Sequence, residues 1–131
     1  MDARTIAPMP HPLETQYVNL ATFRRDGREV RTPVWIAADG GRYYVFTAAA
    51  AGKTKRIRAN GRARLAPCTA RGKLTGEWFD ASARVVDAPP VVARAYAALR
   101  AKYGWQMRLL DWMSKLTGRY DQRAIIELEL T

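Results

Sequence analysis

The sequence predicts a mainly β fold, an antiparallel barrel with peripheral helices. Short runs of β-branched and aromatic residues alternate with tight-turn dipeptides such as Asp26-Gly27 and Asn60-Gly61, a pattern typical of hairpin-linked strands. Helices are expected only in one short basic stretch and in two segments near the C-terminus. Short hairpin-linked strands with few helices favour an antiparallel barrel over a parallel sheet. With 131 residues, the chain has the size of one domain, and residues 1–131 are expected to form it.

The first predicted hairpin joins strands over residues 17–25 and 29–38. In the second strand Val34 and Ile36 share one face, and Trp35 lies on the other. Pro33 is unusual there, because proline cannot donate to a ladder and belongs at an edge or a bulge. A bulge would bend the strand and expose backbone to a flat ligand, but an ordinary edge strand explains the residue equally well.

The remaining elements follow from turns and periodicity. A third strand over 42–47 leads through small residues to a basic helix that starts at Gly52 or Lys53, and strands follow over 62–68 and 76–86. Proline at residues 89 and 90 suits the first turn of a helix. The last strand is expected over 122–131, which gives the order β-β-β-α-β-β-α-α-β. Two amphipathic helical faces precede it: Val92, Ala95, Tyr96, Leu99 and Tyr103, then Leu109, Trp112, Met113 and Leu116.

Positive charge is concentrated in one part of the chain. The net charge is +10, from 22 Lys and Arg against 12 Asp and Glu. Residues 20–75 contain 13 of the cations and three acids, so this segment carries the whole excess. Such a patch attracts a polyanion, which could be a phosphorylated cofactor, a nucleic acid or an anionic membrane.

The basic helix is the strongest candidate for an anion site. Its first backbone N–H groups lack intrahelical partners, and the helix dipole favours phosphate at that end. Four cations fall in the six residues from Lys53 to Arg58, and Ile57 is the apolar position expected to hold the helix against the core. A solvated basic helix is the alternative interpretation.

Several chemistries are disfavoured by the residues present. The chain has one cysteine, Cys68, and one histidine, His11. It can therefore form no internal disulfide and no multi-cysteine metal site, and it shows no local nucleophile–base signature. We therefore predict no catalytic side chain and no metal site, with reactivity supplied by something bound. No run approaches a membrane span or a signal peptide, so a cytoplasmic protein without a membrane partner is expected.

Residues 15–86 resemble a known family. YVNLATFRRDGREVRTPVWIAADGGRYYVFT followed by AGKTKRIRANGRARLAPC is similar to the pyridoxamine-5′-phosphate-oxidase-like split β-barrel superfamily. Within it, the sequence looks most like the F420-dependent (flavin/deazaflavin) oxidoreductases. The resemblance implies an FMN-binding-like split barrel of six to seven strands, a homodimer with the cofactor between subunits, and hydride transfer to a small electron-poor substrate.

The resemblance also implies which residues bind the cofactor. The ring system would lie along the strand that contains Trp35, and the phosphate would lie at the start of the basic helix. The predicted cofactor-binding residues are Arg31, Thr32, Pro33, Val34, Trp35, Thr47, Gly52, Lys53, Thr54, Lys55 and Arg56.

Coenzyme F420 is the first choice of cofactor, with FMN as the alternative and a tetrapyrrole-like ligand as a third. F420 is more anionic than FMN, and cations extending through Arg58, Arg62 and Arg64 suit its longer tail. The family's Ser-Arg-Lys run is Ala51-Gly52-Lys53 here, so one phosphate-binding arginine is missing. Residues 122–131 lack the substrate motif of true pyridoxamine phosphate oxidases, which disfavours vitamin B6 oxidation.

The sequence is compatible with two other functions. The chain could bind a cofactor without catalysing a reaction. It could instead be a basic barrel that binds single-stranded nucleic acid on a platform of Tyr43, Tyr44 and Phe46. Nucleic acid is the less favoured partner, because the cations gather at one helix start and its flanking turns.

Overall fold

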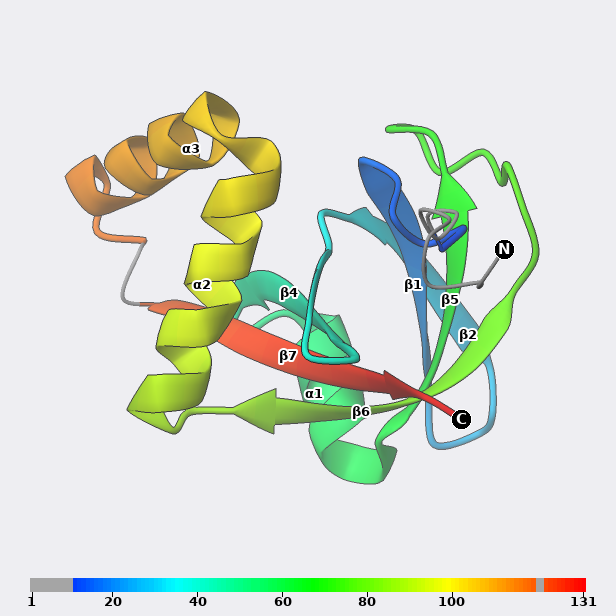
Figure 1. Ribbon diagram of the computed structural model, residues 1–131. Coiled ribbons are helices and arrows are strands. Elements are labelled where there is room, and N and C mark those ends of the chain that lie inside the picture. The colour runs from blue at the N-terminus through cyan, green and yellow to red at the C-terminus, as the bar shows by residue number, and fades with distance from the viewer. Residues whose placement is uncertain (1–10, 120–121) are drawn as a thin grey trace, which may run out of the picture.

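The computed structural model describes residues 11–119 and 122–131. These residues form one antiparallel sheet and three helices (Figure 1). The strands are β1 (Tyr17–Phe23), β2 (Glu29–Val34), β3 (Ala37–Asp39), β4 (Arg42–Ala48), β5 (Arg62–Cys68), β6 (Phe79–Val86) and β7 (Arg123–Leu130). The helices are α1 (Gly52–Asn60), α2 (Pro89–Tyr103) and α3 (Trp105–Leu116).

The strand order shows that the sheet is curled into a barrel. The order is β2-β1-β5-β6-β7-β4-β3, so β2 and β3 lie at opposite edges although they are consecutive in sequence. In a flat sheet six strand spacings of about 4.8 Å would separate them by roughly 29 Å. The chain from residue 34 to residue 37 spans at most about 11 Å. The two edges must therefore approach each other, and the prediction of a split β-barrel is confirmed.

The region around Pro33 differs from the predicted single strand over 29–38. The ladder stops after Val34 and resumes at Ala37, on the other edge of the sheet. Pro33 pairs with Asn19 of β1 and has no strand on its other side. As an edge residue it needs no ladder N–H on that side, so proline is tolerated. The strand breaks at Trp35-Ile36 because the chain there passes from one barrel edge to the other.

The barrel interior contains one face of every long strand. Val18, Leu20, Leu65, Ile126 and Leu128 are fully buried in this cluster. Residues two apart on a strand share a face, so each strand turns alternate side chains into the barrel. The predicted strand over 76–86 starts later, at Phe79, and residues before it form a loop with a single bridge from Leu74 to Cys68.

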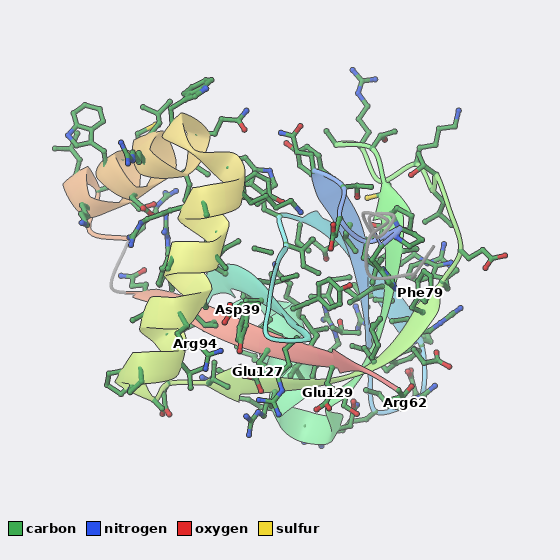
Figure 2. All side chains as sticks on the ribbon, viewed as in Figure 1. Asp39, Arg62, Phe79, Arg94, Glu127 and Glu129 are labelled. Atoms are coloured by element: carbon green, nitrogen blue, oxygen red, sulfur yellow. The ribbon has the colours of Figure 1, made fainter. Side chains whose placement is uncertain are left out.

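Helix α2 covers the outer face of the barrel. The predicted apolar face packs there, with Ala95, Tyr96, Leu99 and Tyr103 buried. An exposed ion pair of 2.8 Å between Arg94 and Asp39 joins the helix to the end of β3 (Figure 2). None of the helices in the two described ranges is long and apolar enough to cross a membrane.

Candidate cofactor site

An apolar cleft lies where β2 ends, beside β4 and the first turn of α1. It has a volume of about 300 Å³. We call it the ring cleft, and it is lined by Tyr17, Pro33, Val34, Trp35, Phe46, Thr47, Lys53 and Leu110. Aromatic walls with one cation suit a flat, anionic ring compound.

Trp35 is held in place from behind by α2. Its indole stacks on the Tyr103 ring at 4.3 Å between centroids and 6° between planes, and it meets Phe46 edge-on at 6.4 Å. The Tyr103 hydroxyl accepts from the backbone N–H of Ile36 at 2.9 Å and donates to the carbonyl of Gln16 at 2.7 Å. Burial raises the pKa of Tyr103 to about 12. The neutral hydroxyl thus fastens the segments on both sides of the cleft.

A second cavity, the basic pocket, lies between the β1–β2 hairpin and α1. It measures about 470 Å³ and is lined by Arg24, Arg25, Asp26, Arg28, Gly52, Lys55 and Arg56. The one acid among these residues, Asp26, is bonded to Arg28 at 2.7 Å. The pocket therefore has a large excess of positive charge, which favours an anionic ligand.

Arg56 is held in a fixed position in the wall of this pocket. Its Nε donates to the Thr22 hydroxyl at 2.7 Å. A Cβ built at Gly52 would lie 2.8 Å from the Arg56 Nη1 atom, so glycine is what lets the guanidinium approach the helix start. Burial, and then the charge of Arg24, lowers the pKa of Arg56. Arginine nevertheless remains charged at neutral pH.

The first turn of α1 offers its backbone to the same region. Ala51 precedes the helix in an extended conformation and provides no side-chain cap, and the first turn contains no acid. The N–H groups at this end thus have no intrahelical acceptor. The buried Thr54 hydroxyl donates to the Ala48 carbonyl at 2.9 Å, which fixes the preceding loop. Ile57 is buried in the barrel, as predicted.

Nine of the eleven predicted residues fall into three groups. Five line the ring cleft and three line the basic pocket, while Thr54 supports the loop. The first group is Pro33, Val34, Trp35, Thr47 and Lys53; the second is Gly52, Lys55 and Arg56.

Arg31 and Thr32 line neither cavity. Arg31 lies two residues before Pro33 on β2. Its guanidinium stacks on Trp78 at 4.8 Å and pairs with Glu29 at 3.0 Å. Arg64, which the sequence suggested for an anionic tail, packs on the same indole at 4.8 Å. These two cations are therefore directed to the outer surface of the sheet.

Sequence reasoning missed the hairpin arginines and part of the aromatic wall. Arg24 and Arg25 face Arg56 only because the β1–β2 turn folds toward α1, a contact between distant segments. Tyr17, Phe46 and Leu110 come from three separate elements. The concentration of cations in residues 20–75 was the available signal for the arginines.

A third cavity extends the ring cleft toward α3. It shares Phe46, Thr47 and Leu110 with the cleft and measures about 410 Å³. Arg123 forms part of its wall, with Nη1 2.7 Å from Asp111 and Nη2 2.7 Å from the Ser114 hydroxyl. This cavity thus borders the same side chains as the ring cleft.

Among the described residues that line these three cavities, Asp26 is the only His, Cys, Asp or Glu, and one carboxylate does not make a metal site. The single histidine packs against Phe79 at 5.0 Å and Tyr43 at 6.1 Å, outside the ring cleft. Among residues 11–119 and 122–131, no group of three His, Cys, Asp or Glu side chains could hold a metal ion. Cys68 is buried, which raises the pKa of its thiol.

The family can now be assigned. The family model described as pyridoxamine 5′-phosphate oxidase matches residues 12–131. The chain belongs to this family. Since the match includes the cleft, the basic pocket and all three helices, the family's split barrel is the framework on which this site is built. A comparison with curated proteins gave no match.

Solved structures share the fold at low sequence identity. The heme storage protein HutZ of Vibrio cholerae has 15% identity and a TM-score of 0.68, and the match covers 88% of this chain and 82% of the HutZ chain. The conserved hypothetical protein Rv2991 of Mycobacterium tuberculosis has 20% identity and a TM-score of 0.64, covering 88% and 72%. An F420 reductase has 21% identity and a TM-score of 0.57, covering 95% and 96%. The family fold thus occurs with more than one kind of ligand.

Proposed function

We propose that this protein is an oxidoreductase that uses coenzyme F420, with FMN as the alternative cofactor. The observation that carries the proposal is the adjacency of the aromatic ring cleft and the basic pocket at the start of α1, joined through Gly52 and Lys53. A flat ring with a phosphorylated tail has both of these chemistries in one molecule. Family membership and the F420 reductase of similar fold support this choice.

The residues present fit such a cofactor. Trp35 and Pro33 provide a flat wall for the ring, and Lys53 lies at its polar edge. The N–H groups of the first α1 turn and the Arg56 guanidinium suit a phosphate. Gly52 lacks a Cβ, which would lie 2.8 Å from the Arg56 Nη1 atom, so Arg56 can lie beside the start of the helix.

The number of cations favours F420 over FMN. Arg24, Arg25 and Arg28 add three positive charges to those of α1, and the only acid of the pocket neutralises one of them. A single phosphate monoester needs fewer partners than this. A phosphodiester followed by an oligoglutamate tail would use the hairpin arginines as well.

The protein's own residues bind, orient and exclude water in this proposal. A bound deazaflavin or flavin supplies hydride transfer to or from an electron-poor organic substrate. Tyr103 keeps Trp35 in position, and the third cavity provides a place for the substrate beside the ring. No side chain is assigned as an essential acid or base.

We also propose a homodimer in the cytoplasm, with each cleft completed by the other subunit. The ring cleft is open, and about 300 Å³ is at the lower limit for a site that buries a drug-sized ligand. A second subunit would supply the missing wall.

A non-catalytic cofactor carrier remains the second candidate, because structures of similar fold include a heme storage protein. The placement of the only histidine, outside the cleft, argues against heme held by histidine in this chain. The aromatic platform suggested for nucleic-acid binding is not available on the surface of the described chain. Tyr43 and Tyr44 are buried, and Phe46 belongs to the cleft.

The test is direct titration of the purified protein with F420, FMN and heme, read out by fluorescence or absorbance. We expect tight F420 binding and a loss of about tenfold or more on Lys53→Ala, the size of one charge-assisted contact. Arg58→Ala is the matched control, because Arg58 is an exposed cation of α1 that lines neither cavity.

Turnover is tested with reduced F420 and a panel of quinones and enones. Cofactor binding without turnover of any of these would favour the carrier function. Binding of single-stranded oligonucleotides with no response to either flavin-type cofactor would refute the proposal.

A further inference from the structure

Helix α3 exposes an apolar stripe to solvent. Trp105, Trp112 and Leu116 are 72%, 62% and 73% exposed, and Leu109 and Met113 are also largely exposed. Positions 105, 109, 112 and 116 recur at intervals of four and three residues, so they lie along one side of the helix. Soluble monomers seldom expose so many large apolar side chains together.

The opposite side of α3 is firmly attached to the protein. Met107 is fully buried. The buried Asp111 carboxylate accepts from the Arg100 Nε at 3.0 Å and from the Arg123 Nη1 at 2.7 Å. The apolar stripe therefore faces outward in a fixed orientation, and Figure 1 shows α3 beside α2 at the periphery of the molecule.

The exposed surface of α3 contains cations and no acid. Arg108 and Lys115 are exposed within the helix, and Arg119 follows it. Asp111 is the only acid in residues 105–119, and it is buried. The exposed charged residues within 105–119 are thus all cations, in a chain whose net charge is +10.

This charge pattern distinguishes between two occupants. Pairing of two copies along the stripe would bring the cationic flanks together, which is unfavourable. Leu74 is the only other exposed large apolar residue in the described parts of the chain, so α3 has little else to pack on in a second copy. An anionic bilayer surface offers apolar depth and negative charge at once.

We propose that α3 is a membrane-surface helix that binds anionic lipid bilayers. The helix lies in the plane of the interface with Trp105, Leu109 and Leu116 inserted among the acyl chains. Indole side chains suit this depth because they combine an apolar ring with a polar N–H. The Arg108 guanidinium reaches the headgroup phosphates. The expectation of no membrane partner rested on the lack of a spanning segment, which does not address a helix lying in the surface.

The test is co-sedimentation of the full chain with vesicles of phosphatidylcholine, with or without about 30 mol% phosphatidylglycerol. We expect binding to the anionic vesicles at least about tenfold tighter than to neutral ones, weakened about tenfold by ~0.5 M salt. Trp112→Ala and Arg108→Glu should each reduce binding about tenfold.

Leu74→Ser is the matched control, since it removes an exposed apolar residue elsewhere and should leave vesicle binding unchanged. Circular dichroism verifies that each variant is folded, and Arg108→Glu keeps the test valid if Trp112→Ala is not. Failure of the wild type to bind anionic vesicles overturns the proposal. A second outcome also overturns it: Arg108→Glu or Trp112→Ala converts an oligomer to a monomer and leaves vesicle binding unchanged. That result would mean that the stripe binds a second copy of the chain. Cofactor titration is independent of both results.

Discussion

Helices α1 and α3 are both short and basic, yet they present opposite surfaces. Helix α1 buries its one strongly apolar side chain, Ile57, in the barrel and turns cations toward a pocket. Helix α3 buries a charged group, Asp111, and turns tryptophan and leucine outward. An amphipathic pattern thus shows that a helix has two faces, but the partners available on the protein decide which face is buried.

The largest expected effect comes from removing the charged attachment of α3. Asp111→Ala leaves the Arg123 guanidinium, whose side chain is 8% exposed, without its buried carboxylate. We expect a loss of about 3–5 kcal/mol in the free energy of unfolding, measured by chemical denaturation. Asp26→Ala removes an exposed ion pair and should cost less than about 1 kcal/mol. Equal losses in the two variants would contradict the structural role of Asp111.

The apolar attachment of α1 gives the next largest effect. Ile57→Ala should destabilise the protein by about 2–4 kcal/mol, because it leaves a cavity in the barrel. Leu116→Ala on α3 removes a side chain of similar size that is 73% exposed, so we expect a change within about 0.5 kcal/mol. Denaturation midpoints measure both, and a large loss in Leu116→Ala would show that the stripe is covered in solution.

The same contrast explains what the sequence could predict. Strand faces and the α2 face follow from local periodicity, and the structure agrees with them. Local charge indicates anion binding at the start of α1, which stays a prediction. The outward orientation of α3 could not be predicted, because the partners of Asp111 are Arg100 on α2 and Arg123 on β7. Local pattern contains no information on such contacts.

The split of the second strand was missed for a related reason. The alternation of Val34 and Ile36 continues through the break, so the pattern shows no interruption. Only barrel closure, a property of all seven strands, requires the chain to change edges there. The indole that Arg31 contacts, Trp78, comes from a loop predicted as strand.

The pH dependence of ligand binding tests the cationic surface of α1. Burial, and then the charge of Arg56, lowers the pKa of Lys53 from 10.5. A bound anion stabilises the ammonium and raises this pKa, so affinity is full below the pKa of the free protein and falls as pH rises through it. The decline should therefore begin at a lower pH than for an ordinary lysine. Titrations of F420 at increasing pH measure this decline in affinity.

Lys53→Arg should flatten the pH profile of binding, because arginine keeps its charge. An identical decline in that variant would assign the effect to another group.

The ends of the two helices give the smallest and sharpest comparison. Gly61 ends α1 at φ +70° and donates its N–H to the Ile57 carbonyl, while Gly118 follows α3 at φ +76°. Alanine at either position adopts a left-handed conformation at about 1–2 kcal/mol. A Cβ at Gly61 would also lie 3.1 Å from the Ala83 carbonyl oxygen, whereas none of the described atoms lies within 4 Å of one at Gly118. Gly61→Ala should therefore lower the free energy of unfolding more than Gly118→Ala. The difference measures how closely α1 is pressed against β6. A larger loss at Gly118 would mean that the end of α3 is the more constrained of the two, which is the reverse of the attachment described for α1.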